Sequence, residues 1–252
     1  MSELTDLSVI LITKNEELNL RRCLHSLPEG VEIVVVDSQS SDGTLAIAKE
    51  FGAKVYQKEF VDFASQKNEA LSKATRPWVL SLDADEELIG PVAQALQTAI
   101  GNSNTAGYRL PRHLVFMNRH LRFGKTKDAP LRLFQRSKGK FSGAIHEEVD
   151  LGGGAVKRLS GLTLLHYSYR DLSDYFARFN RYTNAIASNP TAQGKTVPML
   201  SHIFRPWIEF FTRYVLRLGF LDGYPGYTYA LISSLYAYIK YAKLNELRDS
   251  HD

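Results

Sequence analysis

Two aspartates that directly follow an apolar segment have the spacing that most clearly suggests chemistry. Residues 79–82 are mostly apolar and lead without a turn signal into Asp83, Ala84 and Asp85. Side chains two residues apart on a strand share a face, so Asp83 and Asp85 are expected to point toward one place. Carboxylate oxygens are ligands for Mg²⁺ or Mn²⁺, and such a cation neutralises a diphosphate leaving group. The alternative is a solvated strand end followed by a capped helix.

The first hundred residues alternate between strand and helix patterns, which indicates how these aspartates are positioned. Strands are predicted over 7–13, 31–36, 54–56 and 79–82, and helices over 18–27, 44–51, 63–74 and 91–100. This order predicts an α/β fold with a mostly parallel sheet and right-handed crossovers. Ligands of such sheets bind beyond the carboxyl ends of the strands. Four polar residues fall at those ends: Thr13, Asp37, Asp83 and Asp85.

The second half of the chain mixes strands with a helix and ends in an aromatic extension. Strands are predicted over 106–110, 131–134, 144–149 and 162–166, and a helix over 172–187 that begins at Asp171 or Ser173. Residues 152–154 are three glycines without a following helix pattern, so we predict a turn rather than a phosphate loop. We expect one domain over residues 1–190 and a helical extension over 191–252.

The extension is helical, aromatic and basic, and a turn is predicted at residues 222–226 within it. The uncharged segment 227–239 is too short to span a bilayer with a hydrocarbon core of ~30 Å. Two alternatives stay open. The helices can pack on the catalytic domain or on a second subunit of a homo-oligomer. Alternatively, they form an interfacial membrane anchor, with basic side chains at lipid phosphates and aromatic ones at headgroup depth.

Composition limits the class of protein without identifying its ligand. The 252 residues carry a net charge of +4, which suits nucleotides, phospholipids, phosphorylated glycans or nucleic acid. Cys23 is the single cysteine, so an intramolecular disulfide is excluded, and we expect a small buried side chain. The N-terminus is polar and acidic with no secretory signal, which predicts a cytoplasmic protein.

Four ordered segments carry a resemblance to a known family. They are residues 7–16, 34–44, 66–71 and 82–86, which include Thr13-Lys14-Asn15-Glu16 and Leu82-Asp83-Ala84-Asp85-Glu86. Together they resemble the family 2 glycosyltransferases, which have a GT-A fold. Residues 130–134, 141–147, 165–169 and 218–244 are similar to a narrower branch, the lipopolysaccharide inner-core β-glucosyltransferases.

The resemblance implies a metal-dependent inverting transferase with Mg²⁺ or Mn²⁺ as its cofactor. It would move a hexose, expected to be glucose from UDP-glucose, to a lipid-linked inner-core saccharide at the inner face of the cytoplasmic membrane, with no nucleic acid partner. Two alternatives stay open: a nucleotidyltransferase or a non-catalytic binder of sugar nucleotides or glycans. Nucleotidyltransferases usually carry a glycine-rich loop after the first strand, and residues 13–16 contain no glycine.

Site residues follow from the same resemblance, beginning with the nucleotide. Asp37 is expected to contact the nucleoside, and Thr13 and Glu16 to border the same pocket. Lys67 and Asn68 are expected near the nucleotide, although a solvated helix face is the alternative for Lys67. Asp83 is assigned to the donor diphosphate and Asp85 to the metal, whereas Glu86 and Glu87 are expected only to favour the start of the next helix.

The reacting groups are expected from the second half. An inverting transfer needs a base that removes the proton of the acceptor hydroxyl, and the resemblance favours Glu147, with Glu148 as the fallback. The two point to opposite faces if their segment is a strand. His166 ends an apolar strand and is either a metal ligand or a satisfied buried histidine. Arg132 lies on a predicted strand, and a buried arginine needs a phosphate or carboxylate partner.

Overall fold

The computed structural model describes residues 4–102, 104–143, 147–188 and 199–249, and the chain forms two compact units. Unit 1 comprises Met1–Arg112 and Asp128–His166, and unit 2 comprises His113–Lys127 and Tyr167–Asp252. The boundary expected near residue 190 therefore lies inside unit 2. The reason is that helix α5 (Leu172–Ala187) packs against helix α8 (Gly223–Asp249) and belongs to the same compact unit.

Unit 1 is built on a seven-stranded, mostly parallel sheet, as the alternating sequence pattern predicts. Its central strands β4, β1, β2 and β3 are parallel, and β10 joins β4 antiparallel. The order across the sheet is β13 (Val156–Arg158), β6 (Gly107–Arg109), β10 (Leu131–Gln135), β4 (Trp78–Asp83), β1 (Leu7–Thr13), β2 (Glu32–Asp37) and β3 (Lys54–Gln57).

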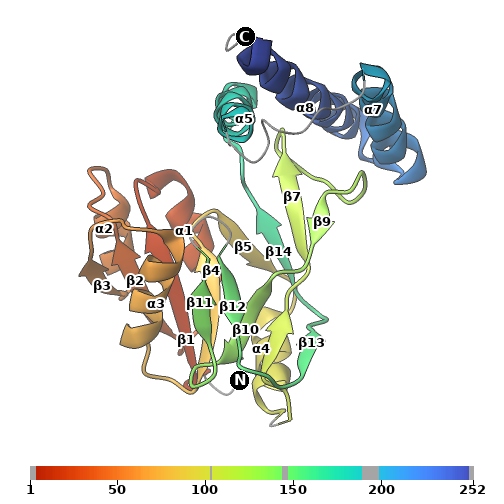
Figure 1. Ribbon diagram of the computed structural model, residues 1–252. Coiled ribbons are helices and arrows are strands. Elements are labelled where there is room, and N and C mark those ends of the chain that lie inside the picture. The colour runs from red at the N-terminus through yellow and green to blue at the C-terminus, as the bar shows by residue number, and fades with distance from the viewer. Residues whose placement is uncertain (1–3, 103, 144–146, 189–198, 250–252) are drawn as a thin grey trace. The chain divides into compact units, whose positions relative to one another are not determined.

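Alternation along the central strands explains the layers on the two faces of this sheet (Figure 1). In β1, Val9 and Leu11 pack with helices α1 (Glu17–His25), α2 (Thr44–Glu50) and α4 (Val92–Ile100), and Cys23 of α1 is buried there as expected. Ile10 points to the other face, against helix α3 (Phe63–Lys73) and strand β11 (Lys140–Ser142). Because both faces are covered, the carboxyl ends of the strands are left to form a site.

The segment after the two aspartates is a strand, which corrects the expectation that Glu86 and Glu87 begin a helix. Strand β5 (Glu86–Ile89) pairs antiparallel with β14 (Thr163–His166), and α4 begins only at Val92. Gly90 makes the turn between them with φ of 104°, and a Cβ there would lie 2.7 Å from the carbonyl oxygen of Gly161. The strand is therefore fixed by a partner some 75 residues away in sequence, as the pairing of Leu88 with Leu164 illustrates.

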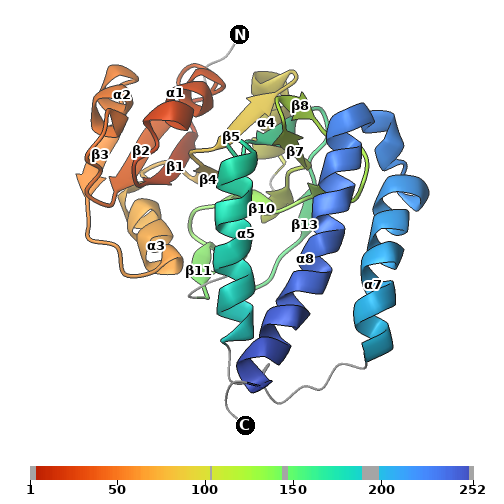
Figure 2. The same cartoon turned by 90° about the horizontal axis from the view of Figure 1, so that it is seen from above.

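Unit 2 is mainly helical, and α8 lies between α5 and helix α7 (Met199–Phe211), as Figure 2 shows. Its core joins Phe116 of strand β7 (Arg112–Phe116) to Tyr175 and Phe179 of α5 and Ile232 of α8. Asp171 caps α5 by accepting from the backbone of Asp174 at 2.7 Å, as predicted. Two short strands, β8 (Arg119–His120) and β9 (Lys127–Asp128), follow β7 in sequence.

The connection from α7 to α8 differs from the turn expected at residues 222–226. A π-helical turn (Thr212–Leu216) and a 3₁₀ turn (Gly219–Asp222) precede α8, which begins at Gly223. Pro225 therefore lies in the first turn of α8, where its missing N–H costs no helical hydrogen bond. Within the described part of the chain, no helix combines the length and the apolar character needed to cross a membrane.

Candidate active site

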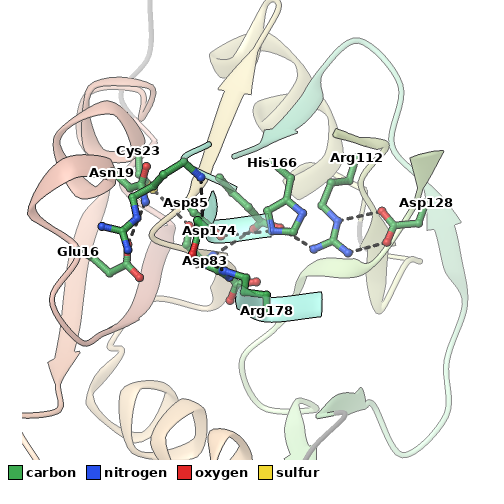
Figure 3. Close-up of polar contacts among 12 residues, drawn as sticks. Glu16, Asn19, Cys23, Asp83, Asp85, Arg112, Asp128, His166, Asp174 and Arg178 are labelled. Carbon is green, nitrogen blue, oxygen red and sulfur yellow. Dashed lines mark hydrogen bonds and ion pairs between the residues drawn. The ribbon is translucent and has the colours of Figure 1, made fainter. Parts of the chain in front are cut away.

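The carboxyl ends of β1 and β2 are joined through a buried aspartate. Thr13 pairs with Asp37 across the sheet, and its hydroxyl donates to Asp37 Oδ1 at 2.8 Å. Asp37 is fully buried and also accepts from the backbone N–H and the hydroxyl of Ser40, at 2.8 and 2.5 Å. Glu16 precedes α1 and accepts from Asn19 at 3.1 Å (Figure 3). These residues order the loops at the sheet edge, and their contact with a nucleoside stays a prediction.

The two loops that follow β1 and β2 are also linked to one another. Asn15 and Gln39 have φ of 56° and 59°, in the left-handed region that non-glycine residues seldom adopt. The backbone of Asn15 donates to the Ser40 hydroxyl, and its side-chain oxygen accepts from the backbone of Ser41, both at 2.8 Å. The loops therefore form one preorganised rim rather than two independent segments.

Asp83, at the end of β4, is held by two buried cations. Lys67 donates to Asp83 Oδ1 at 2.9 Å, and Arg132 donates to Asp83 Oδ2. Lys67 is 2% exposed, so the alternative of a solvated helix face is wrong for this residue. Burial alone would raise the pKa of Asp83, but the charges of Arg132 and Lys67 outweigh it and hold that pKa well below its usual range. Asp83 is thus an ionised carboxylate whose oxygens are already engaged.

Arg132 forms ion pairs with carboxylates, as expected for a buried arginine, and it is the first residue of a series of alternating positive and negative side chains. Its guanidinium also donates to Glu86 at 2.6 Å, and Glu86 in turn accepts from Arg112 at 3.0 Å. Arg112 forms two further hydrogen bonds to Asp128, at 2.8 and 2.5 Å (Figure 3). Sequence reasoning missed Glu86, Arg112 and Asp128. The available signal was the position of Glu86 beside a buried strand, where an ionised group needs cations.

Asp85 differs from Asp83 in its contacts as well as in backbone geometry. It occupies the two-residue turn between β4 and β5, so the same-face argument for a continuous strand does not apply. Its Oδ2 lies 3.4 Å from Nε2 of His166 at the end of β14 (Figure 3). Both side chains keep about a quarter of their surface exposed, 22% for Asp85 and 24% for His166.

Asp85 and His166 are the pair whose chemistry suits a divalent cation. A carboxylate oxygen suits Mg²⁺ or Mn²⁺, and an imidazole nitrogen suits transition metals. Among the described residues, His, Cys, Asp and Glu side chains do not gather in threes or more as a complete metal site would require. A two-ligand site fits a cation that takes its remaining ligands from water and substrate phosphates, as is usual for Mg²⁺ bound with nucleotides.

Glu147 reaches the same buried lysine from the second half of the chain. It immediately precedes strand β12 (Glu148–Asp150), and Lys67 donates to its Oε1 at 2.7 Å. Glu148 is exposed, so the two acids differ in environment, but Glu147 lies before the strand and the opposite-face argument does not apply to it. Residues 144–146 of the strand expected over 144–149 lie outside the described residues. Glu147 is therefore the acid of this segment that joins the charges at the sheet edge.

Asn68 holds the hairpin that carries Glu147. Its amide nitrogen donates to the carbonyl oxygen of Phe141 at 2.8 Å, and its oxygen accepts from the backbone N–H of Phe141 at 2.9 Å. Both polar atoms of the amide are thus used by β11, which pairs with β12. In this structure Asn68 positions the hairpin, and a direct contact with a nucleotide stays a prediction.

Comparison with known proteins gives the same class of fold. The chain is 29% identical over 251 residues to the lipopolysaccharide core biosynthesis glycosyltransferase LpsC of Rhizobium meliloti, covering 94% of this chain and 91% of that protein. It is 28% identical over 255 residues to an uncharacterised glycosyltransferase of Rickettsia felis, covering 95% and 89%.

Solved structures with a similar fold include a mannosyltransferase and a protein bound to UDP-GlcNAc. The mannosyltransferase PcManGT of Pyrobaculum calidifontis, in complex with GDP-Man and Mn²⁺, has a TM-score of 0.53 and 18% identity and covers 95% of this chain and 86% of that chain. S. aureus TarS 1–349 in complex with UDP-GlcNAc has a TM-score of 0.50 and 16% identity, covering 97% and 91%. The family described as glycosyl transferase family 2 matches residues 8–158. The chain belongs to glycosyl transferase family 2 and is a glycosyltransferase with the GT-A fold.

Proposed function

We propose that this protein is a metal-dependent inverting hexosyltransferase that moves glucose from UDP-glucose to an inner-core saccharide of lipopolysaccharide. The observation that carries the proposal is the meeting of Asp83 and Glu147 on the ammonium of Lys67. It puts an acid from the second half of the chain at the edge of the sheet where GT-A folds bind their donor. The relationship to LpsC supports the lipopolysaccharide core as the acceptor class.

In this proposal the donor lies across the carboxyl ends of β1, β2 and β4. Thr13, Glu16 and Asp37 border the nucleoside, because they line the loops that follow β1 and β2. Asp83, held by Lys67 and Arg132, borders the diphosphate. Asp85 and His166 hold the Mg²⁺ or Mn²⁺, which as a Lewis acid would neutralise charge on the departing diphosphate. The relatives solved with GDP-Man, Mn²⁺ and UDP-GlcNAc support a nucleotide-sugar donor.

Glu147 is the proposed base. It takes the proton of the acceptor hydroxyl while that oxygen forms a bond to the anomeric carbon, and the bond from that carbon to the diphosphate oxygen breaks. Attack from the face opposite the leaving group inverts the anomeric configuration. Glu147 is held by Lys67 and its hairpin is held by Asn68, so the carboxylate is preorganised by contacts within unit 1. Glu148, which is exposed, is the fallback base.

We infer that the acceptor is lipid-linked and that the enzyme works as a peripheral protein at the inner face of the cytoplasmic membrane. The LpsC relationship supports this inference, because the lipopolysaccharide core is carried on a lipid. It agrees with the described helices, none of which spans a bilayer.

A panel of sugar nucleotides tests the proposal, with release of the nucleoside diphosphate measured in the presence of Mn²⁺ or Mg²⁺ and an inner-core acceptor. UDP release with transfer of glucose, abolished in Asp85→Ala, is the expected result. Release of pyrophosphate instead would identify nucleotidyl transfer, and binding without turnover in any pairing would identify a non-catalytic binder. The anomeric configuration of the product, read by NMR, checks the inversion.

A further inference from the structure

Exposed apolar side chains are concentrated in unit 2, and most of them lie on α7, α8 and their connection. Of the 25 large hydrophobic side chains that are exposed among the described residues, 20 belong to unit 2, and 15 of these lie between Ile203 and Tyr238. Contiguous apolar surface on this scale marks an interaction site, because a monomeric soluble protein seldom leaves so much uncovered. The question is what covers it.

Six of these exposed residues line one groove between the two helices. Its walls include Ile203 and Trp207 of α7 and, at helical spacing, Tyr227, Leu231, Leu235 and Tyr238 of α8. Each of these six side chains, here named the α7–α8 groove face, is 38% to 72% exposed. The groove has a volume of about 530 Å³, and the opposite side of α8 is buried against α5. The groove itself is therefore not filled by side chains of the described part of unit 2.

Charge indicates the kind of partner. Unit 2 contains fourteen Lys and Arg and seven Asp and Glu, a net charge of +7, which leaves −3 for unit 1 out of the total of +4. The net positive charge of the protein thus comes from the unit that also carries most of the exposed apolar side chains. A surface that is both apolar and positive is complementary to an anionic bilayer, and it opposes pairing with a second copy of itself.

The acids along α7 and α8 do not cancel this charge. Between residues 199 and 239 only Glu209 and Asp222 are acidic. Glu209 accepts from Arg213 at 2.7 Å, and the Asp222 carboxylate accepts from the backbone of Arg122 and Phe123 at 2.9 to 3.0 Å.

Two exposed arginines in this region have no acidic partner among the described residues. Arg217 is exposed and forms no ion pair with the described residues. Arg205 is exposed and forms no ion pair with the described residues; it donates to the neutral hydroxyl of Tyr241 at 2.8 Å and lies over the ring of that tyrosine. The hydrogen bonds to Asp222 also fix the basic segment 119–127 beside the α7–α8 connection. Both arginines are sequence neighbours of exposed apolar side chains, Phe204 beside Arg205 and Leu216 and Leu218 beside Arg217. Exposed basic and apolar side chains in one segment are the composition of helices that lie in a membrane interface.

We propose that the α7–α8 groove face is a docking surface for an anionic phospholipid bilayer. Trp207 and the α8 residues of the groove face enter the boundary between headgroups and acyl chains. Arg205 and Arg217 contact lipid phosphates. The inference rests on the exposed surface and charge of unit 2 and does not depend on glycosyl transfer.

The test is sedimentation of the full-length protein, without donor, with vesicles of phosphatidylcholine alone or of phosphatidylcholine and phosphatidylglycerol. Binding is expected only to the anionic vesicles and is expected to weaken as salt is raised. Trp207→Ala should weaken it by about tenfold, the change expected for an aromatic side chain that leaves an apolar phase. Arg205→Gln combined with Arg217→Gln should weaken it about 25-fold, at roughly fivefold per arginine.

Matched controls lie on unit 1. Phe60→Ala removes an aromatic side chain that is 48% exposed, and Lys157→Gln with Arg158→Gln removes two exposed charges. These variants should bind like the wild type, and thermal unfolding checks that all variants fold. Absence of vesicle binding overturns the proposal, and so do controls that weaken it equally. A dimer that Trp207→Ala converts to a monomer, without vesicle binding, would instead identify the groove face as a subunit interface.

Discussion

The ammonium of Lys67 donates at 2.7 Å to the carboxylate of Glu147, although 80 residues separate the two in sequence. The same ammonium donates at 2.9 Å to Asp83, and its side chain is only 3% exposed. Two carboxylates from different halves of the chain thus share one buried cation. This lysine couples the proposed base to the donor edge of the sheet, which makes its surroundings the most direct place to test the mechanism.

Glu147→Gln is expected to lower kcat by about 10² to 10⁴-fold, the usual contribution of a general base. Glutamine preserves the shape of the side chain and can still accept from Lys67, so binding of the donor should change little. Steady-state turnover and the affinity for UDP measure the two effects separately. Glu148→Gln is the matched control, because Glu148 is the exposed neighbour and should keep wild-type turnover. Loss of activity in Glu148→Gln with full activity in Glu147→Gln would reverse the assignment.

Lys67→Met should lower the stability of the protein as well as its turnover rate. The change leaves Asp83 and Glu147 without their shared ammonium in a largely buried place, and removing one partner of a buried ion pair typically costs about 3 kcal/mol or more. Chemical denaturation measures the change in the free energy of unfolding. Lys67→Arg keeps the charge and should recover most of the stability. Equal stability of Lys67→Met and the wild type would show that the pair contributes nothing to folding.

The parallel sheet could be predicted because its determinants are local. Residues 31–36 and 79–82 are mostly apolar runs followed by an acid, and that pattern alone indicates a buried strand whose carboxyl end carries polar groups. Strand β5 could not be predicted this way. Glu86 is 1% exposed, and what makes its burial tolerable is Arg132, 46 residues later, together with Arg112. Long-range charge pairing leaves no periodic signal in the sequence.

In the candidate site, too, some features could be predicted from local sequence and others depend on contacts far along the chain. The positions of Asp83 and Asp85 followed from the strand that precedes them, whereas their separate environments follow from a two-residue turn and from partners far along the chain. Asn68 shows the limit most clearly. The position of a residue in a helix predicts the face of the helix on which its side chain lies. The hydrogen bonds of Asn68 to Phe141, however, depend on a hairpin 73 residues later.

Metal binding is predicted to depend on Asp85 and His166 and not on Asp83 as a direct ligand. Thermal stabilisation by Mn²⁺ in the presence of UDP is expected for the wild type, because a ligand that binds only the folded protein stabilises it. Asp85→Asn and His166→Ala should each remove most of this shift, and kcat/KM should fall by at least about 100-fold. A chelator should abolish turnover of the wild type, and added Mn²⁺ should restore it. A full Mn²⁺-dependent shift in both variants would contradict the assignment.

Acid stability is predicted to depend on Glu32, which lies far from these ligands at the start of β2. Burial would raise its pKa, but hydrogen bonds from Lys54, Ser8 and the backbone and hydroxyl of Thr75 lower it from 4.5 to about 2. A depressed carboxyl pKa stabilises the folded state fully above the unfolded value, and this contribution is lost as pH falls from about 4.5 toward 2. It amounts to about 3 kcal/mol at neutral pH.

Glu32→Gln should therefore lower the free energy of unfolding at pH 7 by about 3 kcal/mol, and the difference from wild type should shrink between pH 4.5 and 2. Urea denaturation at a series of pH values measures both effects. Glu50→Gln is the matched control, because Glu50 pairs with Arg21 on the surface, where water screens the interaction, and its side chain is 56% exposed. A constant difference between Glu32→Gln and wild type at every pH would show that hydrogen bonding, and not the charge of Glu32, joins β2 to β1 and to the segment before β4.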